Sequence, residues 1–323
     1  MKQRRRIVVS SFCPPESQER PSRPFQGAVK TQIRAWEERF ASVWPDEPDL
    51  LVVPECCDRY KALAPELLLE YYQERGQQVL EAFAAQARQH HCYIVYSAWL
   101  KDSAGTPRNA SVLLDRQGKI SGVYCKNHLM AGESARGIRC GDRAELFETD
   151  FGKVGMCICF DLNFRELLER YAVQEPNLML FSSMYHGGLM QSYWAYRCNS
   201  YFVGAVAGVS ASVLNPLGTE VAVSSNYFPS LTTSINLDYQ LVHLDYNWEK
   251  LNALKQAYGR QVQIYDPGRL GSVLISSESE SVDSRQMVAE FEIESWRDYY
   301  QRSLLGHQAD HCPLPKNILE LSK

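Results

Sequence analysis

Three reactive side chains each stand at the end of a short apolar segment with the composition of a β-strand: Glu55 after residues 50–53, Lys126 after residues 120–125, and Cys159 at the end of residues 154–159. Ligands bind at the carboxyl ends of strands in open α/β sheets, so these side chains can meet in one pocket if the strands are neighbours. Together they would supply a general base, a cation that stabilises an oxyanion, and a nucleophile. The combination predicts attack of a cysteine on a carbonyl group.

Cys159 carries the most specific of these signals. An apolar strand runs into it, and a helix is expected from Asn163, with Asp161 or Asn163 as the N-cap. This is the arrangement of a nucleophile elbow, in which the helix N-terminus favours a thiolate and the backbone amide of Phe160 helps to bind an oxyanion. Cys157, two residues earlier and deeper in the strand, is expected to be a core residue.

Each of these residues also has an ordinary structural interpretation. Glutamate and lysine are mostly exposed, so Glu55 or Lys126 taken alone would be a surface residue, and His128 a packing or orienting histidine. It is the conjunction at three strand ends that favours catalysis. The sequence has none of the motifs of other enzyme and nucleotide-binding families, such as G-x-S-x-G, the P-loop, G-x-G-x-x-G or H-E-x-x-H. The cysteine spacings do not suit zinc, so no metal is expected.

The same residues resemble the motifs of the carbon-nitrogen hydrolase (nitrilase-like) superfamily, in the family order. The segments that carry the resemblance are Pro54-Glu55, Tyr124-x-Lys126-x-His128-Leu129 and Gly155-x-x-x-Cys159-Phe160-Asp161-x-x-Phe164-x-Glu166-Leu167, supported by Asn109-Ala110-Ser111-Val112, Arg197 and Asn215-Pro216-x-Gly218. The resemblance covers residues 6–246 and implies an α/β fold, a four-layer αββα sandwich with mixed sheets. It also implies Glu55 as base and acid, Lys126 as stabiliser of the tetrahedral species, and Cys159 as nucleophile.

Further site residues follow from the resemblance. Glu133, seven residues after Lys126, resembles a second glutamate that orients substrate or lysine, with a loop carboxylate as the alternative. No metal and no organic cofactor are implied. Phe160-Asp161 after the cysteine resembles the amidase and carbamoyl-hydrolase branches, whereas nitrilases usually have Trp-Glu there. An amide or N-carbamoyl substrate is therefore expected over a nitrile.

Substrate contacts are expected from the loop that follows residues 178–181, because it ends at the same edge of the sheet. Tyr185 and His186 are the candidates in this loop, and Tyr60, five residues after Glu55, is the candidate for the opposite wall. The alternatives are loop packing for Tyr185 and His186 and an aromatic core role for Tyr60.

Composition excludes several other classes. With 45% hydrophobic residues, 22% charged residues and a net charge of −4, the chain has the composition of a globular protein without a basic surface. Nucleic acid and membranes are therefore not expected as partners, and no apolar run reaches the length of about 18 residues that a membrane span needs. No signal peptide is expected, and ten irregularly spaced cysteines predict reduced thiols in the cytoplasm.

Apolar segments and amphipathic helical patterns alternate along the chain. Strands are expected at 7–12, 50–53, 93–99, 110–115, 120–125, 154–159, 178–181 and 202–209, and helices at 28–43, 74–90, 163–172 and 190–200. Hairpin turns at 115–118 and 215–218 predict antiparallel pairs as well. One hydrolase domain is expected over residues 1–285, ending after the polar stretch 276–284. The C-terminal extension 286–323 would then pack on the domain or on a partner subunit.

These observations predict an enzyme, a hydrolase that cleaves a non-peptide C–N bond of a small amide or carbamoyl compound through a cysteine thioester. A homodimer or larger homo-oligomer is expected by resemblance. The alternatives are a nitrilase, an amide or acyl transferase, and a non-catalytic binding protein of the same fold. A redox protein using Cys157 and Cys159 is disfavoured, because a disulfide between same-face residues of one strand would be strained.

Overall fold

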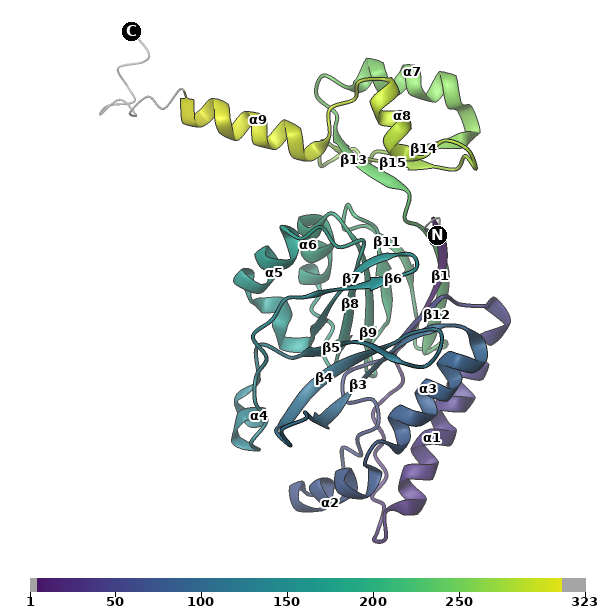
Figure 1. Cartoon of the computed structure of the whole chain (residues 1–323), viewed down its shortest axis with the longest axis vertical. Coiled ribbons are helices and arrows are strands. Elements are labelled where there is room, and N and C mark those ends of the chain that lie inside the picture. Colours follow the sequence, from purple (N-terminus) through teal and green to yellow (C-terminus); the bar gives the residue numbers. More distant parts are fainter. Residues whose placement is uncertain (1–4, 310–323) are drawn as a thin grey trace, which may run out of the picture. The chain divides into compact units, whose positions relative to one another are not determined.

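The computed structural model describes residues 5–309, which form two compact units that divide between Leu237 and Asp238 (Figure 1). The residues singled out for catalysis all belong to the first unit. Residues 310–323 of the expected C-terminal extension lie outside the described residues.

The first sheet of the first unit has six strands in the order β12-β1-β2-β3-β4-β5. They are β1 (Arg6–Phe12), β2 (Leu50–Val52), β3 (Tyr93–Lys101), β4 (Pro107–Leu114), β5 (Ile120–Cys125) and β12 (Ser230–Asn236). β1, β2 and β3 run parallel, and the other pairs are antiparallel. The hairpin predicted at 115–118 joins β4 to β5, where the amide of Gly118, at φ +72°, donates to the Asp115 carbonyl at 2.8 Å.

The second sheet has the order β11-β10-β9-β8-β7-β6. Its strands are β6 (Leu146–Thr149), β7 (Gly152–Ile158), β8 (Leu178–Ser183), β9 (Tyr201–Val206), β10 (Ser212–Leu214) and β11 (Glu220–Val223). β7, β8 and β9 are parallel, and the pairs at both edges are antiparallel. The predicted turn at 215–218 joins β10 to β11 through a hydrogen bond from the Gly218 amide to the Asn215 carbonyl of 2.8 Å.

The two sheets face each other, and helices cover their outer faces (Figure 1). The outer helices are α1 (Gln26–Ala41) and α3 (Gln78–His90) on the first sheet, and α5 (Arg165–Ala172) and α6 (Leu189–Cys198) on the second. The apolar side chains of α1 and α3, such as Trp36 and Phe83, pack on the strand residues of one face. Between the sheets, the hydroxyl of Ser182 donates to the Val53 carbonyl at 2.8 Å. The four-layer αββα sandwich with mixed sheets is thus confirmed.

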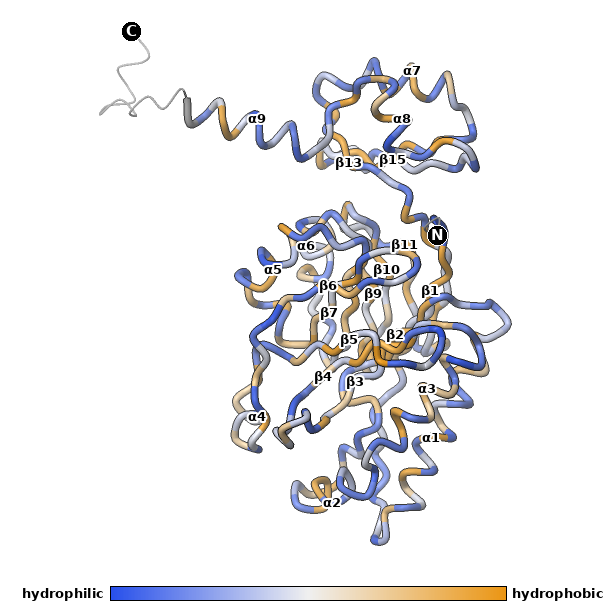
Figure 2. Tube along the Cα trace, in the orientation of Figure 1, coloured by the Kyte–Doolittle hydropathy of each residue, from blue (hydrophilic) through white to orange (hydrophobic). Residues whose placement is uncertain are grey.

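Hydrophobic residues follow the strands of both sheets, whereas the connecting loops are largely hydrophilic (Figure 2). Two short helices, α2 (Pro65–Arg75) and α4 (Ala131–Ala135), lie in connections. The helix predicted over 74–90 is in fact interrupted, because α2 ends at Gly76, which has a φ of +49° that favours glycine.

The second unit has its own small hydrophobic core. It contains β13 (Tyr239–His243), β14 (Val262–Tyr265) and β15 (Ser272–Ser277) in an antiparallel sheet, with α7 (Trp248–Tyr258), α8 (Ser284–Glu290) and α9 (Trp296–Ala309). Its buried residues include Val242, Leu254, Val273 and Met287. The compact units divide after Leu237, whereas the sequence predicted a hydrolase domain that extends to residue 285. The polar stretch 276–284 did not mark the boundary because its side chains bond within the second unit, as Ser284 does to Asp238.

Candidate active site

The three residues predicted for catalysis come from both sheets of the sandwich. Glu55 follows β2 and Lys126 follows β5, both in the first sheet, whereas Cys159 follows β7 in the second. The three strands are therefore not neighbours, which was the condition given above for the three side chains to meet. The face-to-face packing of the two sheets brings their ends together instead, and all three residues line one cavity.

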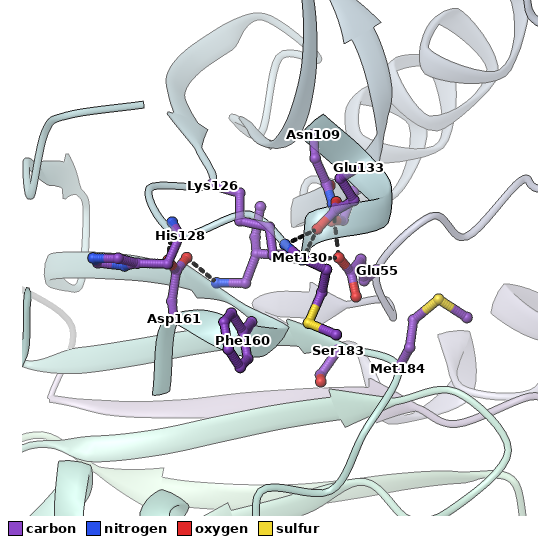
Figure 3. Close-up of polar contacts among 12 residues, drawn as sticks. Glu55, Asn109, Lys126, His128, Met130, Glu133, Phe160, Asp161, Ser183 and Met184 are labelled. Carbon is purple, nitrogen blue, oxygen red and sulfur yellow. Dashed lines mark hydrogen bonds and ion pairs between the residues drawn. The ribbon is translucent and has the colours of Figure 1, made fainter. Parts of the chain in front are cut away.

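A buried lysine links two carboxylates at the centre of this site (Figure 3). The Nζ of Lys126 donates to Oε1 of Glu55 and to Oε2 of Glu133, each at 2.8 Å. Lys126 is 1% exposed and Glu55 is 4% exposed, so water screens this ion pair little. The amide of Met130, the residue before α4, also donates to Glu133 at 2.9 Å and ties this carboxylate to the N-terminus of α4.

Asn109, at the end of β4 that faces this network, bridges the same two carboxylates. Its Nδ2 donates to Glu55 at 2.7 Å and to Glu133 at 2.6 Å. Its backbone carbonyl accepts from the amide of Lys126 at 2.8 Å. Asn109 was not predicted as a site residue, although it lies in a segment that carries the family resemblance. These contacts hold both carboxylates in one orientation.

Cys159 sits at a sharp turn, as expected for a nucleophile elbow. Its φ is +50°, a left-handed conformation that a residue with a Cβ adopts only at some cost. The predicted helix N-terminus differs, however, because residues Cys159–Asn163 form a short 3-10 helix and α5 begins only at Arg165. Neither Asp161 nor Asn163 caps α5.

The electrostatic environment of Cys159 is also different from the prediction. Burial and the charge of Glu55 raise the pKa of the Cys159 thiol to about 12, against the lowering effect of Lys126 and of hydrogen bonds with Met184 and Ser183. The resting form is therefore a thiol rather than a thiolate favoured by a helix. For Lys126, burial opposes the charge, but Glu55, Cys159 and Glu133 outweigh it and raise its pKa. Lys126 is therefore charged.

Asp161 links the Lys126 segment to the Cys159 turn. This fully buried carboxylate accepts from the hydroxyl of Tyr124 at 2.7 Å, from the amide of His128 at 2.9 Å and from the amide of Ile158 at 3.0 Å. The ring of His128 adds a contact between Nδ1 and Asp161 of 3.0 Å. Since Tyr124 and His128 flank Lys126, these bonds set the position of the lysine relative to the cysteine.

The cavity in which the catalytic candidates meet has a volume of about 530 Å³. Its lining consists of Glu55, Cys56, Arg59, Trp99, Lys126, Met130, Glu133, Arg136, Cys159, Phe160, Asn163, Met184 and Tyr185. Phe160 and Tyr185 were predicted here, and the hydroxyl of Tyr185 contacts Asn163 Nδ2 at 3.0 Å. A volume of this size suits one small molecule.

Two of the residues predicted to bind substrate do not line this cavity. Tyr60 is 1% exposed, packs edge-on against Tyr71 and donates its hydroxyl to the Ala28 carbonyl at 2.8 Å, which is the core role given as the alternative. His186 accepts from the amide of Gly188 through Nδ1 at 3.1 Å, a local loop contact. Arg59, Trp99 and Arg136 were missed, because spacing along the chain does not show which loop side chains share a wall.

Other features of the described residues bear on the remaining expectations. Within residues 5–309, no group of three or more His, Cys, Asp or Glu side chains is arranged to hold a metal ion. The nine cysteines in this range are free thiols, and Cys157 is fully buried. No helix among the residues that the structure describes has the length and hydrophobicity to span a membrane.

Comparison with known proteins identifies relatives of low sequence identity. The chain is 29% identical to a protein named probable nitrilase C965.09 of Schizosaccharomyces pombe, over 30% of this chain and only 36% of that relative. It is 21% identical to omega-amidase NIT2 of Xenopus tropicalis, over 59% of this chain and 77% of the relative.

A solved structure shows the same fold, and a family model identifies the chain. Nit3 of Saccharomyces cerevisiae, described as a member of branch 10 of the nitrilase superfamily, superimposes with a TM-score of 0.61 at 18% identity, covering 83% of this chain and 98% of Nit3. The family model for carbon-nitrogen hydrolases matches residues 25–216, more than half of the 323 residues. The chain belongs to the carbon-nitrogen hydrolase family.

Proposed function

We propose that this protein hydrolyses the C–N bond of a small amide or N-carbamoyl compound through a thioester on Cys159. The observation that carries the proposal is the buried network of Lys126 with Glu55 and Glu133, which lines one cavity with Cys159. The network combines the base, the cation and the nucleophile that such a reaction needs.

Acylation begins with a proton transfer from the Cys159 thiol to Glu55. Because burial and Glu55 raise the pKa of this thiol to about 12, the proton is not lost to solvent, and a base in the cavity must take it as the sulfur attacks. A C–S bond forms, and the electron pair of the carbonyl C=O bond moves to oxygen. The ammonium of Lys126 and the amide of Phe160 stabilise the resulting oxyanion.

The tetrahedral species then breaks down in the forward direction. The C–N bond breaks as Glu55 returns its proton to the departing nitrogen, so that ammonia or an amine leaves and the acyl group remains on Cys159. Glu55, again a carboxylate, removes a proton from water as its oxygen attacks the thioester. The C–S bond breaks, the sulfur regains its proton from Glu55, and the acid product leaves.

The substrate class follows from the residues after the nucleophile and from the relatives. Phe160-Asp161 resembles the amidase and carbamoyl-hydrolase branches, and an omega-amidase is among the similar proteins. Both observations favour an amide or carbamoyl carbonyl over a nitrile.

Release of ammonia or amine from a panel of ω-amides, aliphatic amides, N-carbamoyl amino acids and nitriles tests the proposal. The Cys159→Ala variant should lose the activity by orders of magnitude. The matched control is Cys140→Ser, which changes an exposed cysteine outside the cavity and should keep it. Mass spectrometry of the enzyme quenched in acid during turnover should show an acyl group on Cys159.

Three results would contradict the proposal or part of it. Turnover by the Cys159→Ala variant would remove the nucleophile from the mechanism. Acyl transfer to an added amine, with no hydrolysis when the amine is left out, would assign a transferase. A Cys159 that resists alkylation, in a protein inactive on the whole panel, would favour a binding protein of the same fold.

A further inference from the structure

Two arginines line the same cavity as Cys159 but take no part in the proposed chemistry. Arg136 directly follows α4 and is exposed. Its guanidinium lies 5.9 Å from the centroid of the Trp99 ring, a neighbour that carries no charge to neutralise it. Among residues 5–309, no carboxylate forms an ion pair with Arg136.

Arg59 is the second arginine of the cavity lining, and Glu16 partly compensates its charge. Its Nη2 donates to the carboxylate of Glu16 and to the sulfur of Met184. Its Nε is buried and finds no acceptor within the described part of the chain. The indole Nε1 of Trp99, a residue only 6% exposed, is equally buried and without an acceptor there. The lining thus contains donors and positive charge in excess of its acceptors.

The carboxylates of the cavity lining belong to the network around Lys126. Glu55 and Glu133 face the single ammonium of Lys126, and Cys159 is a neutral thiol at rest. A carboxylate on the substrate is repelled by these glutamates and attracted by Arg136, whereas a neutral amide carbonyl meets no such repulsion. These charges favour one orientation of the substrate, in which its amide carbonyl lies at Cys159 and its carboxylate lies at Arg136.

We propose that Arg136, together with Arg59 in the same cavity lining, binds a carboxylate group of the substrate. The guanidinium group suits this task because its planar fork of N–H donors matches a carboxylate in a bidentate pair. The substrate class is therefore the monoamides or N-carbamoyl derivatives of short carboxylic acids rather than simple aliphatic amides. This inference rests on the proposed function and names the specificity of the same site.

Pairs of substrates that differ only in the terminal carboxylate distinguish carboxylate binding from cleavage of the amide. Succinic and glutaric monoamides are compared with amides of the same length in which a methyl group replaces the carboxylate, and kcat/KM is measured for each. The unmodified protein should prefer the acids. Arg136→Gln should lower the acid-to-neutral ratio by about 10- to 100-fold, the value of one charge-assisted contact, mainly through KM.

The control variant is Arg139→Gln, which changes an exposed arginine of the same loop that is not part of the cavity lining and should leave the ratio unchanged. A purely structural role of Arg136 would lower kcat/KM for acid and neutral amides alike. Arg136→Lys keeps the charge without the fork and should retain part of the preference.

A direct measurement of binding tests the carboxylate site even if the protein turns over none of these amides. Calorimetric titration of the Cys159→Ala variant with the monoamides and their neutral partners measures the anion preference alone. Equal affinity for both members of a pair, or a ratio near one in turnover by the unmodified protein, would overturn the inference while leaving the hydrolase proposal standing. Preferential binding of the acids without turnover would support the anion site and contradict the proposed reaction.

Discussion

Replacement of Asn109 by aspartate places a carboxyl group where one amide now bridges two carboxylates. The Asn109 Nδ2 lies 2.7 Å from a Glu55 oxygen and 2.6 Å from a Glu133 oxygen. If an ionised aspartate oxygen took the place of this nitrogen, it would be repelled by each carboxylate. For unit charges at these distances and an effective dielectric constant of about 20, each repulsion is about 6 kcal/mol. Only one ammonium, that of Lys126, is bonded to these two carboxylates to offset this repulsion.

The introduced carboxyl group in N109D should therefore stay protonated at pH values well above the usual aspartate pKa of about 3.9. A folded-state pKa raised above the unfolded value gives stability that is fully present at pH values below the unfolded pKa and is lost as pH rises through the folded pKa. Each unit of this shift costs about 1.4 kcal/mol of stability at high pH. The free energy of unfolding of N109D should fall by several kcal/mol between pH 5 and pH 8, relative to the unmodified protein.

Urea unfolding at a series of pH values measures this effect. The matched control is Asn109→Leu, which also removes the bridge from Asn109 but adds no ionisable group, so its loss of stability should not follow this pH dependence. The activity of N109D on any substrate that the protein turns over should likewise be greater at acidic than at neutral pH, relative to the unmodified protein. A difference in stability between N109D and the unmodified protein that is constant from pH 5 to pH 8 would refute the proposed proximity of the three side chains.

Four other predictions follow from the geometry of the first unit. Burial and the charge of Glu55 raise the pKa of the Cys159 thiol, so Glu55→Gln should speed the alkylation of Cys159 by iodoacetamide at pH 8. The same variant should abolish turnover. An unchanged rate of alkylation would argue against electrostatic coupling between Glu55 and Cys159. Lys126→Met leaves two buried carboxylates unpaired and should lower the free energy of unfolding by about 3–5 kcal/mol, whereas Lys153→Met, at a side chain 52% exposed, should change it little. Burial lowers the pKa of His128, but bonds with Asp161 and Glu166 outweigh it and raise the pKa, so the stability that His128→Asn removes should shrink as pH rises from 5.5 to 9; a constant difference in urea midpoints would contradict this. Gly118→Ala would bring a Cβ within 2.2 Å of the Ala84 carbonyl at a φ of +72° and should cost about 1–3 kcal/mol in urea unfolding, whereas Gly27→Ala meets nothing within 4 Å and is the control.

Local patterns in the sequence predicted the elements that carry the site. The strands ending before Glu55, Lys126 and Cys159 were correct to within two residues, because a buried strand is an apolar run that stops where polar residues begin. The hairpin turns at 115–118 and 215–218 were equally readable, since a positive φ at Gly118 and Gly218 is a local requirement.

Other features depended on contacts between segments far apart in the chain. The break at Gly76 and the second compact unit after Leu237 were missed. A glycine inside a helical pattern can be tolerated or can end the helix, and packing decides between the two. The three-stranded core of the second unit likewise has no composition that distinguishes it from the first.

The order of residues alone identifies the chemical groups of this protein and places three of them at strand ends. The environment of these groups is visible only in the folded chain, where Asn109 bridges Glu55 and Glu133, Tyr60 is a core residue, and Cys159 rests as a thiol. Hydrogen bonding and desolvation depend on distances between residues tens of positions apart, and these distances are not a local property of the sequence. Residue type is a local property, whereas burial and charge environment arise only when the two sheets pack against each other.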